Sequence, residues 1–301
     1  MNDDAPMVRP VVPEAEREIG VKHPVLTHGY VVLVDYMGND AAIVQAARVS
    51  YGKGTKAVRD DRGLIRYLMR HRHTTPFEMV EFKFLVRLPI FVARQWIRHR
   101  MASVNEYSAR YSVVPDEYEV PPAEEVRHQS TRNRQGRGEP LPPDVVEQFR
   151  NDLDRVSKEA YAAYTRALEA GVARETARLL LPVAYYTQWY WKTDLWNLFH
   201  FLSLRLDPHA QEEIRLYAAE IARITRLVAP VAYEAFEEFT LSGLSLSRRE
   251  QTAVRALLNG KTPEAACSEA GLPLTREDGK PMTTGEGVEF LEKLTRLRSP
   301  E

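Results

Sequence analysis

The pattern of apolar and polar positions predicts three β-strands that are separated by helices. Gly29–Met37 is rich in β-branched and aromatic residues and ends at a Gly-Asn-Asp turn, which is typical of a strand. Glu81–Leu88 alternates charged with apolar side chains, which indicates a strand with one solvated face. Ala184–Lys192 is the most aromatic stretch of the chain. We interpret it as a strand or core segment. Alternatively, its aromatic side chains could line a binding site for a flat ligand.

Apolar residues at helical spacing predict the helices. Four of these helices have a candidate capping residue: Asn39 or Asp40, Asp60 or Asp61, Asp194, and Asp207, which precedes Pro208. The expected helices cover residues 41–49, 60–71, 90–100, 144–170, 174–181, 194–206, 207–229 and 233–239. Residues 101–110 and 127–140 are rich in polar and small side chains, so we expect both stretches to be loops.

These elements predict an α+β fold, a small and mostly antiparallel sheet wrapped by helices, with a C-terminal helical extension. Residues 1–28 carry prolines and scattered charges without a clear period, so we expect an N-terminal tail before a main domain over residues 29–241. Residues 242–301 predict two short helices and a final one, with Ser247 and Glu250 as a capping box. We expect this extension to be accessory to the chemistry.

Composition argues against several classes of protein. The 301 residues carry 41 basic and 42 acidic side chains, so no overall charge favours nucleic acid or an anionic membrane. The single cysteine, Cys267, excludes an intrachain disulfide and a cysteine-ligated zinc site, and no histidine near it in sequence would activate it. The chain lacks an apolar stretch of about 18 residues. Its N-terminus also lacks a signal-peptide pattern, so we expect a soluble, cytoplasmic protein without a membrane partner.

The candidate chemistry is concentrated between Arg87 and Arg110. This stretch contains five arginines, no lysine and one acid, Glu106. Arg94 and Arg98 stand four residues apart on one expected helix and repel each other by roughly 0.2–0.5 kcal/mol, a cost that an anion between them would remove. A solvated basic helix end is the alternative for an isolated arginine pair. The neighbouring histidine, amide, serine and aromatic residues favour an anion-binding site.

The residues also suggest two further hypotheses, a metal site and a nucleic-acid-binding function. His71 and His73 suggest a metal site, but residues two apart on a helix point to different sides and no third ligand has a suitable spacing, so we predict none. A nucleic-acid-binding module is the alternative function. It would use the arginine cluster, the basic stretch at residues 127–137 and the paired C-terminal helices. The balanced charge counts against it.

Three motifs stand in order within residues 29–239: HTTPFE at 73–78, RHR at 98–100 with Ser108 eight residues after its last arginine, and LRLDPHAQ at 204–211. Together they resemble the flavin-dependent thymidylate synthase family. The resemblance implies reductive methylation of dUMP to dTMP, with 5,10-methylenetetrahydrofolate as carbon donor and NADPH or NADH as reductant through bound FAD. It also implies a homotetramer whose active sites combine residues of several chains.

The resemblance further implies a set of site residues. The dUMP site would comprise Gln95, Arg98, Glu106, Tyr107, Ser108, Ala109, Arg110, Arg178 and Arg205. The FAD site would comprise Ser50, Thr75, Arg98, His99, Arg100, Glu106, Asp194, Trp196 and His200, with His73 and Glu78 nearby. Arg205 would be catalytic, because a cation beside a uracil carbonyl favours loss of the N3 proton. No protein nucleophile is needed, since the reduced flavin activates the pyrimidine.

Trp196 departs from the family pattern, which commonly has a polar residue at this position. We therefore do not expect the conventional polar contact to FAD at this position. We expect the ring to stack on the adenine or to pack against the protein.

Overall fold

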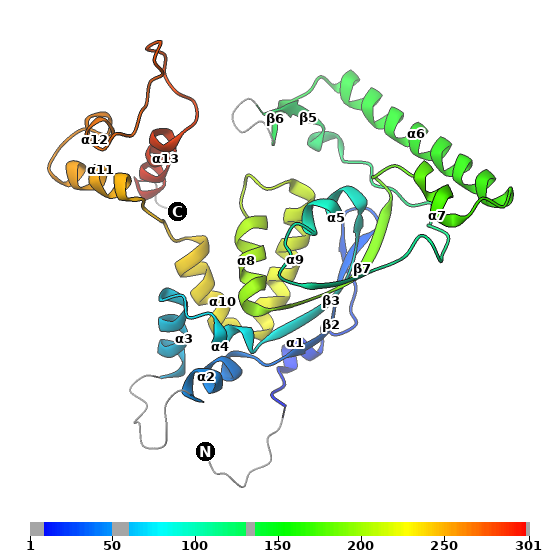
Figure 1. The fold of residues 1–301 in the computed structure, drawn as a ribbon, viewed down its shortest axis with the longest axis horizontal. Helices are drawn as coiled ribbons and strands as arrows, with labels where there is room; N and C mark the ends of the chain where they lie inside the picture. Colours follow the sequence, from blue (N-terminus) through cyan, green and yellow to red (C-terminus); the bar gives the residue numbers. More distant parts are fainter. Residues whose placement is uncertain (1–8, 50–59, 131–135, 299–301) are drawn as a thin grey trace, which may run out of the picture. The chain divides into compact units, whose positions relative to one another are not determined.

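The computed structural model describes residues 9–49, 60–130 and 136–298 of the chain (Figure 1). The chain forms two compact units. The larger one comprises the residues up to Arg127 together with Pro140–Leu241, and the smaller one comprises His128–Glu139 together with the residues from Ser242 onward. A sheet and its surrounding helices make up the larger unit, so the predicted α+β class is confirmed.

A five-stranded antiparallel sheet forms the centre of the larger unit. Its strands lie in the order β1 (His23–Val25), β2 (Gly29–Met37), β3 (Glu81–Pro89), β7 (Tyr186–Asp194) and β4 (Ser103–Glu106). All three predicted strands are present, and the aromatic one lies two residues further along the chain than expected. The register of β3 and β7 places Phe84 opposite Trp191, so aromatic side chains line the packed face of the sheet.

The larger unit also contains ten helices within the described ranges. They are α1 (Pro13–Glu16), α2 (Asp40–Val49), α3 (Asp61–Arg70), α4 (Thr75–Glu78), α5 (Ile90–Trp96), α6 (Pro143–Glu169), α7 (Arg174–Ala177), α8 (Leu195–Arg205), α9 (Glu212–Val228) and α10 (Pro230–Phe236), with the short turns η1 (Ala123–Glu125), η2 (Arg178–Leu180) and η3 (Glu237–Leu241). The helices α8 and α9 lie side by side (Figure 1).

Buried aromatic rings join α5 to α8 and to the sheet. Trp96 of α5 is fully buried. Its ring stacks on Phe201 of α8, with centroids 4.7 Å apart, and meets Trp191 of β7 edge-on at 5.2 Å. Such pairs stabilise packing beyond the area that they bury, so the end of α5 has a fixed position over the sheet.

Residues 103–106 and the start of α9 differ from the sequence prediction. Residues 103–106 form β4 instead of a loop, because β7 has a free edge that pairs with them although their own composition shows no strand pattern. The helix α9 begins at Glu212 instead of Asp207. The Asp207 carboxylate accepts the backbone N–H of His209 at 2.7 Å, so it closes a turn and does not cap the helix.

The segment before β2, where we expected a tail, is packed within the larger unit from about residue 12 onward. Ala15 of α1 is fully buried, and the Tyr36 hydroxyl donates a hydrogen bond to Glu16 at 2.6 Å. The strand β1 pairs with β2. Helices and strands of three or four residues are too short to show a hydrophobic period, so the sequence pattern does not reveal this packing.

The smaller unit contains the three predicted C-terminal helices, α11 (Arg248–Leu258), α12 (Pro263–Glu269) and α13 (Glu286–Arg298). They enclose Cys267 and Phe290, which are both fully buried. The predicted capping box at the start of α11 is confirmed. Its Glu250 also pairs with Lys293 of α13 at 2.7 Å, which connects the first helix of this unit to the last.

Residues 127–140 contain a strand pair where we expected a loop. The strands β5 (Arg127–Gln129) and β6 (Arg137–Pro140) pair with each other. Their three- and four-residue lengths again leave no alternation to detect. Across all the described ranges, no helix is long and apolar enough to cross a membrane.

Candidate active site

The end of α5 turns His99 into the protein and leaves its arginine neighbours outside. The helix was expected to reach Arg100 but ends at Trp96, because the N–H groups of Arg98 and His99 bond to carbonyls three residues earlier and tighten the last turn. His99 is only 7% exposed, whereas Arg98 and Arg100 are exposed. The RHR motif therefore presents one buried imidazole between two accessible guanidinium groups.

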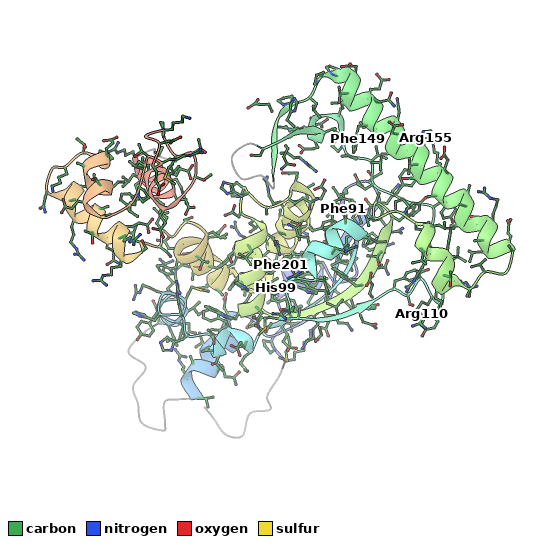
Figure 2. All side chains as sticks on the ribbon, turned by 45° about the horizontal axis from the view of Figure 1, so that its top comes forward. Phe91, His99, Arg110, Phe149, Arg155 and Phe201 are labelled. Carbon is green, nitrogen blue, oxygen red and sulfur yellow. The ribbon has the colours of Figure 1, made fainter. Side chains whose placement is uncertain are left out.

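His99 lies among aromatic rings and basic groups. Its ring centroid is 5.5 Å from that of Phe201 and 5.6 Å from that of His200, and Figure 2 shows His99 beside Phe201. Burial, with smaller contributions from the charges of His200 and Arg205, lowers the pKa of His99 to about 4. His99 is therefore neutral near pH 7 and has one donor and one acceptor nitrogen.

Arg205, the last residue of α8, reaches back to α5. One of its Nη atoms donates to the backbone carbonyl of Gln95 at 3.5 Å. Burial lowers the pKa of Arg205, although an arginine side chain stays protonated at any physiological pH. Within the described ranges no acidic side chain pairs with this guanidinium. A half-buried cation without a carboxylate partner is an unusual feature, and it points to a ligand with negative charge.

Buried polar atoms without a hydrogen-bond partner gather around these residues. In the part of the chain that the structure describes, they include Gln95 Oε1, Trp96 Nε1, His99 Nε2, Trp189 Nε1, Trp191 Nε1 and Arg205 Nε. An unsatisfied buried donor or acceptor costs about 1–3 kcal/mol. Native proteins satisfy nearly all such groups, so their concentration at the junction of α5, β7 and α8 indicates a binding site.

The first motif packs against the start of α8. Phe77 of α4 contacts Trp196, with ring centroids 6.0 Å apart. Asp194 caps α8, as predicted, and Thr75 is exposed at the first position of α4. Trp196 is partly buried and packs against the main core. These three candidate FAD residues therefore belong to one neighbourhood of α4 and α8.

Three candidates for the cofactor site remain, namely His73, Glu78 and Ser50. The ring of His73 faces Tyr67 of α3, with centroids 5.9 Å apart. Glu78 ends α4 and is half-buried. Ser50 lies outside the described residues. No group of three or more histidine, cysteine, aspartate or glutamate side chains that could hold a metal ion occurs in the described ranges.

Two other predicted dUMP residues, Arg110 and Arg178, lie beside α7. Arg110 pairs with Glu175 of α7 at 3.2 Å, and Arg178 donates to the backbone carbonyl of the same residue at 3.3 Å. Figure 2 shows Arg110 beside α7, apart from His99. The loop before Arg110 carries Tyr107, Ser108 and Ala109. Within one chain, the predicted dUMP residues are therefore divided between two places.

Comparison with known proteins identifies the family. The family model described as "Thymidylate synthase complementing protein" matches residues 32–231. The flavin-dependent thymidylate synthase of Thermus thermophilus is 57% identical over 249 residues, which cover 83% of this chain and 90% of that protein. The chain belongs to the flavin-dependent thymidylate synthase family.

Other members of the flavin-dependent thymidylate synthase family and a solved structure agree with this assignment. The enzyme of Wolbachia pipientis is 53% identical over 253 residues, which cover 84% of this chain and 89% of that protein. A UMP/dUMP methylase of Streptomyces cacaoi, solved with bound 5-Br dUMP, superimposes with a TM-score of 0.65 at 38% identity and covers 73% of this chain and 99% of that one. The protein is accordingly an enzyme, a flavin-dependent methyltransferase that makes thymidylate.

The residues at the junction of α5, β7 and α8 fit the flavin that the family requires. A flavin cofactor brings a polar ring system and, in its nucleotide forms, phosphate. The unpaired ring nitrogen of His99 suits the ring system, and the exposed guanidinium groups of Arg98 and Arg100 suit the phosphate. Thr187 of β7, which contacts Glu106, was not singled out from the sequence, because a threonine in an aromatic strand carries no motif.

Proposed function

We propose that this enzyme methylates dUMP to dTMP with 5,10-methylenetetrahydrofolate as carbon donor, NADPH or NADH as reductant and FAD as its flavin. The observation that carries the proposal is the buried group of His99, Gln95 and Arg205, which retains unpaired polar atoms where two family motifs meet. The bound flavin would pass two electrons from the reductant to the transferred carbon. The protein residues would bind, orient and polarise the nucleotide.

Arg205 is the proposed catalytic residue. Its guanidinium is half-buried and has no carboxylate partner in the described ranges. Electrostatic interactions are stronger away from water, so a cation here would strongly favour the uracil anion that loss of the N3 proton produces. Gln95, whose carbonyl accepts from Arg205, would contact the same base through its unpaired side-chain oxygen.

The nucleotide phosphate and the FAD would share the arginines around α5. We assign dUMP to Gln95, Arg98, Glu106, Tyr107, Ser108, Ala109, Arg110, Arg178 and Arg205. We assign FAD to Ser50, Thr75, Arg98, His99, Arg100, Glu106, Asp194, Trp196 and His200, with His73 and Glu78 nearby. The neutral imidazole of His99 would act as a hydrogen-bonding partner and not as a cation. Trp196, packed against Phe77, would offer an apolar ring face to the cofactor.

A homotetramer with shared active sites would reunite the two groups of dUMP residues. Two features support self-association. Arg110 pairs with Glu175 of α7 and lies apart from His99 of the same chain, and Arg178 donates to the backbone of that glutamate. The helix α6 also exposes an apolar stripe, in which Val145, Phe149 and Val156 are 44%, 47% and 45% exposed, and a second copy of the chain would cover it.

Mixing two impaired variants at low salt and subsaturating dUMP tests the shared site. Under these conditions Arg205→Ala is nearly inactive and Arg110→Ala keeps about a tenth of the parental rate. If Arg110 of one chain completes a site that contains Arg205 of another, co-refolded equal mixtures of the two variants should reach roughly a quarter of the parental rate, because about a quarter of the sites are then intact. Sites built within single chains would give only the mean of the two separate variants, about one-twentieth of the parental rate.

Segment 242–301 is proposed to be accessory. The family match ends at residue 231. Cys267 is buried in the small core of this segment, and burial raises its thiol pKa, which disfavours the reactive thiolate. A protein that ends near Gly243 should therefore still form dTMP.

The direct test of the proposed function is turnover by the purified protein. With dUMP, methylenetetrahydrofolate, NADPH and FAD present, dTMP should appear, and omission of any one component should stop it. A protein that binds no flavin, or that makes dTMP without one, would contradict the proposal.

A further inference from the structure

Thr187 is a buried threonine of β7 whose hydroxyl contacts a candidate ligand-binding residue. Its side chain is 7% exposed. The hydroxyl donates a hydrogen bond to Oε1 of Glu106, at the end of β4, over 2.7 Å. Glu106 itself is exposed. The pair therefore joins a buried donor in the sheet to a carboxylate at the surface of the proposed site.

The strand pairing fixes this geometry. Glu106 lies opposite Trp189 in the β4–β7 register, and the next N–H, of Tyr107, donates to the carbonyl of Gln188 at 2.7 Å. Residues 187 and 189 of one strand point to the same side of the sheet, so Thr187 is a diagonal neighbour of Glu106. Because threonine is β-branched, its side-chain torsion is restricted and its hydroxyl has a defined direction.

The hydrogen bond occupies one oxygen of the carboxylate and leaves the other available. Oε1 of Glu106 accepts from Thr187, whereas Oε2 has no protein partner within the described ranges. A carboxylate group is planar, so holding one oxygen also orients the second. A glutamate side chain without such a contact would lose rotamer freedom only when the ligand binds, at a cost in affinity.

We propose that Thr187 is a positioning residue that holds Oε1 of Glu106 and thereby directs Oε2 toward the bound nucleotide. This inference rests on the proposed function, which assigns Glu106 to the nucleotide and cofactor sites. Thr187 does not touch the ligand and acts only through Glu106. Its effect should therefore appear in dUMP affinity and should vanish when Glu106 is removed.

Thr193 offers a matched control on the same strand. It lies six residues further along β7, on the same side, and is 2% exposed. Its hydroxyl donates to the backbone carbonyl of Met101 at 3.1 Å and not to a candidate side chain. Thr193→Val therefore removes a comparable buried hydrogen bond and a comparable amount of stability, while the Thr187–Glu106 contact is kept.

The experiment is a double-mutant cycle on the FAD-loaded enzyme, with the dUMP dissociation constant measured by calorimetry. Thr187→Val should raise this constant about tenfold, and Thr187→Ser, which keeps the hydroxyl, should restore it to within about threefold. In a Glu106→Ala background, Thr187→Val should have no further effect. Thr193→Val should leave the constant within about twofold of the parent although it lowers the thermal midpoint.

The other possible results contradict either this inference or the proposed function. Parental dUMP affinity in Thr187→Val would overturn the inference, and so would an equal loss in the presence and absence of Glu106. If Glu106→Ala alone binds dUMP normally, then the assignment of Glu106 to the nucleotide site is wrong, which is a failure of the proposed function. If Thr187→Val does not fold, Thr187→Ser is compared with Thr187→Ala, both in the parent and in the Glu106→Ala background. Weaker dUMP binding by Thr187→Ala that requires Glu106 supports the inference, and an equal loss in both backgrounds overturns it.

Discussion

Arg205 and Arg110 are both proposed to bind the same nucleotide, yet the chain holds them in different ways. Arg205 is half-buried beside Gln95 and has no acidic partner in the described ranges. The side chain of Arg110 is 54% exposed and pairs with Glu175, which is 58% exposed. One arginine is desolvated before the ligand arrives, whereas the other is solvated and already has an anionic partner.

This difference separates two contributions to binding. A desolvated cation interacts strongly with a developing anion and needs no reorganisation, so Arg205 is suited to stabilise a transition state. An exposed ion pair contributes about 0–1 kcal/mol and weakens with salt, so Arg110 is suited to attract a phosphate and can exchange Glu175 for it. Substitutions at the two positions should therefore differ in size, in kinetic character and in salt dependence.

The largest effect is expected for Arg205→Ala. Removing a preorganised donor from a buried site should lower kcat by about 100-fold to 1,000-fold. Arg205→Lys should also be impaired, because an ammonium lacks the planar fork. The measurement is dTMP formation, with the flavin absorbance of the purified variants as a control for cofactor retention. Turnover at the parental rate would remove Arg205 from the chemistry.

The next effect is the change in the free energy of unfolding with pH that His99 causes. The pKa of His99 is lowered to about 4, so the folded state resists protonation while the unfolded state takes up a proton as the pH falls through 6.5. This residue therefore makes the protein less stable as the pH falls from 6.5 to 4, by roughly 2 kcal/mol at pH 5.

Chemical denaturation at pH 7 and pH 5 tests this prediction. In the flavin-free protein at one fixed concentration, His99→Asn should reduce the pH-dependent loss in the free energy of unfolding by that amount. His209→Asn serves as the control, because His209 is exposed. An unchanged pH dependence in His99→Asn would show that this imidazole is not held neutral by burial.

The contrast between the two arginines also shows what the sequence could predict. The long strands β2, β3 and β7 and the capping residues Asp60, Asp194 and Ser247 follow from local patterns, and the structure contains them all. Local patterns suffice where one face is buried or where a cap satisfies backbone groups. The resemblance to the family likewise supplied the candidate residues without their surroundings.

Features that depend on distant partners could not be predicted. The strand β4 exists because β7 has a free edge, and Thr187 matters only because β4 places Glu106 beside it. The position of the end of α5 over the sheet depends on aromatic packing of Trp96 against α8. The separation of Arg110 from His99 is likewise a product of the tertiary fold, which the order of motifs along the chain does not contain.

A smaller effect is expected for Arg110→Ala. If Arg110 holds the phosphate from the solvent side, its loss should raise the KM for dUMP about tenfold at low salt, with little change in kcat. The difference from the parent should shrink as ionic strength rises. Arg174→Ala is the matched control: Arg174 lies next to Glu175 on α7, is exposed and, among the described residues, donates only to the Tyr111 carbonyl. Equal effects of both substitutions would indicate a general charge effect.

The smallest effect is expected for Glu175→Gln, and it tests the exchange directly. In the free enzyme Glu175 pairs with Arg110 at 3.2 Å, so dUMP must compete with this carboxylate for the guanidinium. Neutralising Glu175 should raise dUMP affinity about twofold to threefold at low salt, in line with the small value of an exposed ion pair. The gain should disappear near physiological ionic strength and in the Arg110→Ala background. Weaker dUMP binding by Glu175→Gln would instead mean that the ion pair holds Arg110 in the orientation the nucleotide needs, and that both arginines are positioned before binding.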